Sequence, residues 1–285
     1  MHTVNRPHSP VALHVLGIAG VVIVLFGACS DDDSGSGQVG DDVGRFGTEV
    51  DAPSPTTPVA GDGADPGWLS AFDKDGVVSR CDVSEAELAD APSVTIDNRT
   101  LYVAFEQIGV NQNPLLIRYD DGSQVYCVRH EAEGPDGRAL GLTWDGGAHA
   151  YVMYSIVGGA SSLEGKPGWL SSYAPGAISG GGPKVSVLGR VQVADGALTE
   201  ATFVIAVTSA KKVNSHRSTA APVRLADGSV EFRGESAYRP IAVDGKAAMD
   251  CDESPFVTQY RLSPDLGTLM CASSTHCRSE RPCSE

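Results

Sequence analysis

Six Asp-Gly pairs, distributed between residues 121 and 245, constrain the fold more than any other feature of the sequence. They occupy positions 121–122, 136–137, 145–146, 195–196, 227–228 and 244–245. Asp-Gly supplies the positive φ angles that tight turns between antiparallel strands require. The pairs separate short segments rich in β-branched and aromatic residues, so the pattern predicts antiparallel sheets joined by Asp-Gly hairpins.

Strand signals dominate residues 67–285, and helical periodicity is almost absent. The predicted strands are 100–106, 115–119, 124–130, 139–144, 150–157, 169–173, 184–193, 201–208, 222–225, 229–233, 240–243 and 256–262. A capping box, Ser84 with Glu87, predicts one short helix that Pro92 ends. Many short strands with regular turns indicate an all-β sandwich or barrel, and a small β-propeller is the alternative.

Two motifs recur at a spacing of about 100 residues, which suggests an internal duplication. Pro66–Phe72 (PGWLSAF) returns as Pro167–Tyr173 (PGWLSSY), and Asp121-Gly122-Ser123 returns at 227–229. The offsets predict two related units, residues 67–167 and 168–270. Chance similarity between glycine-rich β sequences is the alternative.

An apolar run near the N-terminus, Val11–Ala28, is interrupted only by His14 and ends at Cys29. Arg6 precedes it, and small residues stand directly before the cysteine, which is the layout of a secretory signal peptide. Phe26-Gly27-Ala28-Cys29 resembles the lipobox of bacterial lipoproteins. That resemblance implies removal of residues 1–28 and attachment of fatty acyl chains, such as palmitate, to Cys29. The alternative is an uncleaved membrane anchor, because a spanning helix needs roughly 17–25 apolar residues.

Residues 29–66 form a separate segment that is rich in Ser, Gly, Asp, Pro and Thr. They hold nine acidic residues against one basic residue, Arg45. Such a composition buries too little apolar surface to fold, so we expect a disordered acidic tether. Ser30 follows the lipidated position, and by the resemblance this favours the outer membrane or cell surface over the inner membrane.

The net charge is −15, and residues 67–285 carry −8 of it. Binding to nucleic acid needs clustered basic residues that displace counterions. An acidic body without such a cluster argues against a nucleic-acid partner. A folded segment of this length is long enough to bury a substantial core.

Six cysteines follow Cys29: Cys81, Cys127, Cys251, Cys271, Cys277 and Cys283. An even number in an exported chain predicts three disulfides, although the sequence leaves fifteen pairings open. Proximity in the sequence alone favours Cys81–Cys127, Cys251–Cys271 and Cys277–Cys283. The spacing lacks the two-to-four-residue gap of zinc sites, so neither a metal nor a cofactor is expected.

No catalytic motif is complete in this sequence. His130-Glu131 lacks the second histidine of a zinc helix, and no Gly-x-Ser-x-Gly nucleophile turn occurs. Asp73–Gly76 (DKDG) favours an exposed turn over a calcium loop. Paired acids of a glycosidase remain open, because Glu106, Glu131, Glu133 and Asp145 fall near predicted strand ends.

Three tryptophans, Trp68, Trp144 and Trp169, are candidates for stacking on sugar rings, with a place in the core as the alternative. The sequence therefore predicts a lipid-anchored protein of the cell envelope. Its β domain is expected to have a non-enzymatic binding or structural role, with a surface glycan or protein as ligand. The alternative function is an envelope hydrolase that acts on glycans.

Overall fold

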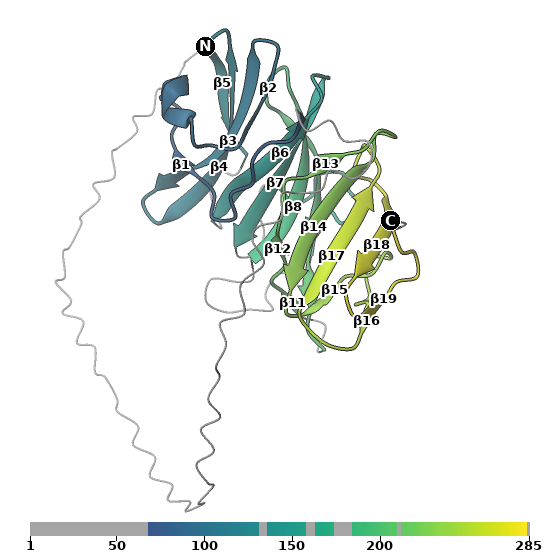
Figure 1. Ribbon diagram of the computed structural model, residues 1–285. Coiled ribbons are helices and arrows are strands. Elements are labelled where there is room, and N and C mark those ends of the chain that lie inside the picture. Colours follow the sequence, from purple (N-terminus) through teal and green to yellow (C-terminus); the bar gives the residue numbers. More distant parts are fainter. Residues whose placement is uncertain (1–67, 131–135, 158–162, 174–183, 210–211, 284–285) are drawn as a thin grey trace, which may run out of the picture. The chain divides into compact units, whose positions relative to one another are not determined.

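The computed structural model describes residues 68–130, 136–157, 163–173, 184–209 and 212–283 (Figure 1). The predicted signal peptide, Cys29 and the tether all lie outside the described residues. The described residues all belong to one compact unit.

Strands account for 53% of the described residues, and all their pairings except β1 with β3 are antiparallel, so the predicted all-β class is confirmed. The first sheet has the order β1-β3-β4-β5, and β2 also pairs with β3. Its strands are β1 (Val78–Ser79), β2 (Ser93–Ile96), β3 (Arg99–Ile108), β4 (Asn111–Asp120) and β5 (Ser123–Arg129). The central sheet consists of β6 (Gly137–Trp144), β7 (His149–Val157), β8 (Lys184–Gln192) and β9 (Leu198–Val204), in that order.

A third large sheet has the order β12-β14-β17-β18, with β13 also paired to β14 (Figure 1). Its strands are β12 (Arg217–Ser218), β13 (Val223–Arg224), β14 (Val230–Ser236), β17 (Phe256–Leu262) and β18 (Leu269–Ser274). Two small sheets complete the fold. One contains β10 (Ala206–Val207), β11 (Val213–Asn214) and β15 (Arg239–Pro240), and the other β16 (Asp250–Cys251) and β19 (Cys277–Arg278).

The central sheet buries both of its faces, because side chains alternate between faces along each strand. One face packs on the first sheet, through Val152, Tyr154, Val187 and Phe203 against Leu101, Val103 and Leu116. The other packs on the third sheet, through Tyr151, Met153, Leu188 and Val204 against Phe232, Tyr260 and Leu262. The large sheets are therefore stacked as layers of a sandwich.

The outer face of the first sheet has a core of its own. Tyr102, Leu115, Ile117 and Tyr119 pack beneath Leu88 and Ala91. Leu88 ends the single turn of 3₁₀ helix η2 (Glu85–Leu88). The capping box is present, since the Glu87 carboxylate accepts bonds from the N–H and hydroxyl of Ser84.

Five of the six Asp-Gly pairs form turns in which the glycine has a positive φ. At the β4–β5 hairpin both Asp121 and Gly122 do so, with φ of 48° and 74°. This is the geometry that makes Asp-Gly a hairpin signal. Asp136-Gly137 is the exception, because Gly137 is the first residue of β6.

The predicted strand at 169–173 is wrong, and seven strands were not predicted: β1, β2, β11, β12, β16, β18 and β19. Trp169 donates its backbone N–H to the Leu266 carbonyl and its indole N–H to the Val243 carbonyl. The chain turns to meet these partners, so it cannot continue a regular ladder.

The described residues of the two PGWLS copies cover opposite edges of the central sheet. At the β6 edge, the N–H groups of Ser70 and Asp73 donate to the carbonyls of Leu142 and Leu140. At the β9 edge, the N–H of Ala201 donates to the Pro167 carbonyl and that of Phe203 to the Leu170 carbonyl. The sheet between them contains strands from both predicted units, and the duplication itself stays a prediction.

All six cysteines after Cys29 form disulfides. Cys81–Cys127 is paired as predicted, but the other two bonds are Cys251–Cys277 and Cys271–Cys283. The predictions Cys251–Cys271 and Cys277–Cys283 are therefore wrong. Cys251 and Cys277 are register partners in the β16–β19 pair. The chain then returns along β18, where the Ala272 N–H donates to the Arg281 carbonyl, and this brings Cys283 to Cys271.

Mass spectrometry of unreduced protein will check the corrected pairing. The segment Leu262–Arg278 holds both Cys271 and Cys277, so trypsin alone should leave three peptides covalently joined. Fragmentation between Ala272 and His276 should then keep Cys271 with the C-terminal peptide and Cys277 with the peptide of Cys251. The opposite distribution would refute the strand-based pairing.

We expect Gly168→Ala to destabilise the β9 edge strongly. A Cβ at position 168 would lie 2.0 Å from the Ala201 carbonyl oxygen, which belongs to the backbone and cannot move freely. Overpacking of this kind costs about 3 kcal/mol of unfolding free energy. Gly109→Ala is the matched control. Gly109 has φ +60°, and a Cβ added there would meet no atom within 4 Å. The only expected cost is therefore the backbone strain of an alanine at positive φ, about 1–2 kcal/mol. Denaturant unfolding measures both, and equal losses would contradict the proposed clash.

Candidate functional site

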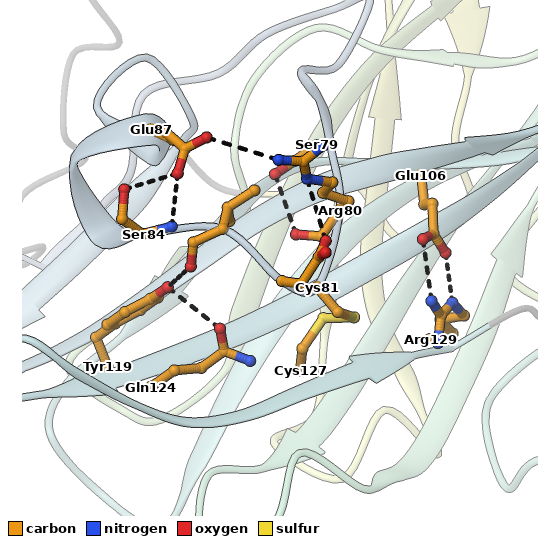
Figure 2. A network of polar contacts seen from close by, with 12 residues as sticks. Ser79, Arg80, Cys81, Ser84, Glu87, Glu106, Tyr119, Gln124, Cys127 and Arg129 are labelled. Atoms are coloured by element: carbon orange, nitrogen blue, oxygen red, sulfur yellow. Dashed lines mark hydrogen bonds and ion pairs between the residues drawn. A yellow bond between two sulfur atoms is a disulfide. The ribbon is translucent and has the colours of Figure 1, made fainter.

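Figure 2 shows a polar network beside the first sheet, where the Cys81–Cys127 disulfide ties the segment before η2 to β5. Arg80 forms ion pairs with Asp82 and Glu87. The Tyr119 hydroxyl donates to the Val83 carbonyl. The disulfide and the tyrosine bond fasten the covering segment onto the sheet, and the ion pairs of Arg80 lie within that segment, so the network has a structural role.

The acids considered for glycoside chemistry are engaged by arginines where they are described. Arg129 donates two hydrogen bonds to the Glu106 carboxylate (Figure 2). Asp145 forms an ion pair with Arg224. Glu131 and Glu133 lie outside the described residues. Each of these two carboxylates is therefore already held by a guanidinium group of the same chain.

The three candidate tryptophans have different environments. Trp144 is 1% exposed, so it belongs to the core and offers no face to a sugar. Its indole N–H donates to the Gly147 carbonyl, and the Arg99 guanidinium lies 5.0 Å from the ring centre. Trp68 and Trp169 are half-buried. A sugar-stacking role for these two stays a prediction.

His130 is a buried histidine at the junction of β5 and the central sheet. Its Nε2 lies 2.9 Å from the Gly196 carbonyl oxygen, and its Nδ1 lies 2.5 Å from the Tyr154 hydroxyl. A carbonyl only accepts, so Nε2 carries the proton and Nδ1 accepts from tyrosine. Burial lowers the pKa of His130 to about 4.

His216 lies between the central and third sheets and is 1% exposed. Its Nε2 is 2.8 Å from the Thr258 hydroxyl, which in turn donates to the Gly234 carbonyl. Burial lowers the pKa of His216 to about 3. A histidine held neutral in this way is a poor general base at neutral pH.

A serine pair connects His216 to the surface. The Ser218 hydroxyl donates to Ser186 over 3.0 Å, and Ser186 donates to the His216 carbonyl. Ser186 is buried, and its hydroxyl is 3.5 Å from the His216 Nδ1. This arrangement is not an activated nucleophile, because the serine proton is directed to the carbonyl and not to the imidazole.

A groove of about 1020 Å³ opens beside Ser218. One wall is the segment 72–75, which runs along the β6 edge. The other wall is β12 with Glu235 of β14. The floor lies at the end of the central sheet, where Arg138, Ser155 and Val157 contribute side chains. None of the three candidate tryptophans lines this groove.

The groove floor begins a polar row that crosses three strands in register. Arg138 of β6 is opposite Ser155 of β7, which is opposite Ser186 of β8. The next residues on this face of β7 and β8, Met153 and Leu188, are apolar and buried. The row therefore marks the place where the hydrophobic interface with the third sheet ends.

Charges of both signs line the groove. The cations are Lys74, Arg138, Lys184 and Arg217, and the acids are Asp73, Asp75, Asp136 and Glu235. Asp73 accepts the N–H groups of Asp75 and Gly76, which confirms the exposed turn predicted there. The sequence did not reveal the groove, because each contributor is an ordinary polar residue on a separate segment.

No family model matches this chain, and neither a curated protein nor a solved structure shows significant similarity to it. Within the described ranges, no helix has the length and hydrophobicity of a membrane span. Those ranges also contain no cluster of three or more potential metal ligands among His, Cys, Asp and Glu.

The buried histidines predict a loss of stability between pH 6.5 and 4. Both folded pKa values lie below the ordinary value of 6.5, so the unfolded chain binds protons first as the pH falls. Their stabilising effect is complete above pH 6.5 and decreases as the pH falls toward 4, by up to about 1.4 kcal/mol per pH unit for each histidine. Aspartates with a lowered pKa, such as Asp120 beside Arg118, also stabilise the fold, but their contribution is lost only below about pH 4.

Denaturant unfolding at pH 7 and pH 4.5 measures this effect. We expect His216→Gln to be less stable at pH 7 but to lose less stability on acidification than the unchanged protein. Replacement of the exposed His276 by Gln is the control. An unchanged pH dependence in His216→Gln would show that this histidine is not the titrating group.

Proposed function

We propose that this chain is an exported lipoprotein, held at the cell envelope by lipid on Cys29, whose sandwich is a non-enzymatic binding domain. One observation carries the proposal. The sequence has seven cysteines, and the structure pairs six of them in disulfides. Cys29, the seventh and the cysteine of the predicted lipobox, is left without a cysteine partner in this scheme.

The disulfides also support export. Structural disulfides persist in oxidising compartments and are rare in the reducing cytosol. Each of the three fastens a peripheral segment, because they join the η2 region to β5, β16 to β19 and the C-terminal residues to β18. A signal peptide before Cys29 would deliver the chain to such a compartment.

A binding role is supported by the way the polar groups of the domain are arranged. The described candidate acids pair with arginines, and both buried histidines are held neutral by their surroundings. The groove, in contrast, has polar groups that meet solvent. Small ligands usually bind in concave sites of about this size.

The second candidate function is a glycan hydrolase of the envelope. The observation in its favour is that four acids line the groove. A glycosidase needs two carboxyl groups about 5–9.5 Å apart, one of them with a raised pKa. Release of reducing sugars from envelope glycans, abolished by Asp136→Asn or Glu235→Gln, would favour this function over binding.

The anchor is tested by expression of the full chain in a bacterial host, comparing the unchanged sequence with Cys29→Ala. We expect the unchanged protein to lose residues 1–28, to gain the mass of acyl chains and to fractionate with membranes. Several acyl chains, at roughly 0.8 kcal/mol per buried CH₂, hold a protein firmly on a bilayer. Intact mass and membrane partitioning measure both effects.

Ser30→Ala is the control, because it retains the thiol and should still be lipidated. If Cys29→Ala and the unchanged protein both keep residues 1–28 and partition alike, the apolar run is an uncleaved anchor. The lipoprotein proposal would then be wrong.

A further inference from the structure

Two neighbouring cations on one side of the groove form no ion pair with another described residue. The Ser215 hydroxyl accepts from the Lys184 N–H, and the Lys184 carbonyl accepts from the His216 N–H. These bonds place the start of β8 directly beside β12, which carries Arg217. Both side chains are exposed, both line the groove, and neither has an ion pair in the described part of the chain.

Arg138 adds a third cation, and its position is fixed before any ligand binds. Its Nε donates to the Gln112 side-chain oxygen over 2.7 Å, and its Nη1 donates to the Asp75 carbonyl over 2.6 Å. The guanidinium carbon lies 4.8 Å from the centre of the Phe105 ring. These partners are neutral, so the positive charge is not compensated by a contacting carboxylate, and Nη2 makes no hydrogen bond to a described residue.

The acids of the groove do not cancel this charge by contact. Asp73 and Asp136 accept backbone N–H groups, and neither they nor Asp75 and Glu235 form an ion pair within the described ranges. The groove thus presents Lys74, Arg138, Lys184 and Arg217 beside an equal number of acids, with no ion pair between them in the described ranges, and Glu235 is the register partner of Arg217. Arg138 and Lys184 face Ser155 and Val157 in register, so spaced anionic groups on a ligand can reach these two cations with no acid directly opposite.

The size and lining of the groove restrict the ligand further. About 1020 Å³ is at the upper end of the range for drug-sized ligands, so an oligomer fits better than a single small anion. The lining is mostly polar, and the Ser155 hydroxyl beside Arg138 makes no hydrogen bond to a described residue. The hydroxyl groups of a sugar can form hydrogen bonds with these polar side chains.

An acidic peptide fits less well than a sugar. Peptides bind extended by adding a strand to a sheet edge, or they place apolar anchors in pockets. The two edges of the central sheet already carry the PGWLS motifs. The apolar residues of the groove are few, namely Phe72, Leu140 and Val157.

We infer that the groove binds an acidic oligosaccharide, whose uronic-acid carboxylates contact Arg138, Lys184 and Arg217 while its hydroxyls meet Ser155 and Ser218. This inference rests on the proposed binding function and names its ligand class. The described cations supply ionic and hydrogen-bonding partners for the sugar acids without any covalent step.

Calorimetric titration of the full mature protein in detergent with hexagalacturonate tests the inference. We expect binding that weakens as salt is added, because the cations are exposed. The double variant Lys184→Gln/Arg217→Gln should weaken binding by about tenfold or more. Lys246→Gln/Arg239→Gln is the matched control, since both residues are exposed, lie outside the groove and lose the same charge. It should bind like the unchanged protein.

Three results would overturn the inference: no binding of hexagalacturonate at millimolar concentration, equal affinity in both double variants, or equal affinity for the methyl-esterified sugar. Tighter binding of hexaglutamate than of hexagalacturonate would assign the groove to acidic peptides instead and would also overturn it. The Cys29 experiment does not depend on the groove. Lipidation without sugar binding would therefore refute this ligand class and leave the membrane anchor standing.

Discussion

The structure depends on one constraint, the burial of both faces of the central antiparallel sheet. Antiparallel sheets commonly leave one face to solvent, and their strands then alternate between apolar and polar residues. Here β7 (HAYVMYSIV) is apolar at almost every position, because successive residues face different cores. Val152 packs toward the first sheet and Met153 toward the third. A register slip of one residue would exchange the two sets, so pairing must be specific.

The same constraint explains the periphery of the fold. A sheet that is buried on both faces still has two edges with unpaired backbone groups, which invite aggregation. The PGWLS motifs cover these edges and bury Leu69 and Trp169 only in part. The disulfides act further out, on short segments that have few apolar contacts of their own. Packing therefore stabilises the centre, and covalent links stabilise the margins.

The groove lies where this double burial stops. Along β6, β7 and β8 the face toward the third sheet changes from Met153 and Leu188 to Ser155 and Arg138. Strand β12 of the third sheet lies at this place, and its two residues cover Ser186 but leave Ser155 and Arg138 partly exposed. Polar side chains at the end of an apolar face contribute little to stability. The proposed ligand site lies at this end of the sandwich, where cations from four segments line one groove.

The sequence by itself determined the features that depend on near neighbours in the chain. Periodicity and turn chemistry located most long strands, five of the Asp-Gly turns and the capping box at Ser84. The tertiary structure decided what depends on distant residues: that Cys251 pairs with Cys277, that Trp144 is buried, and that Arg138 and Arg217 line one groove. The physical reason is that turn and strand preferences act over a few residues, whereas strand pairing and sheet stacking join segments that no local pattern links.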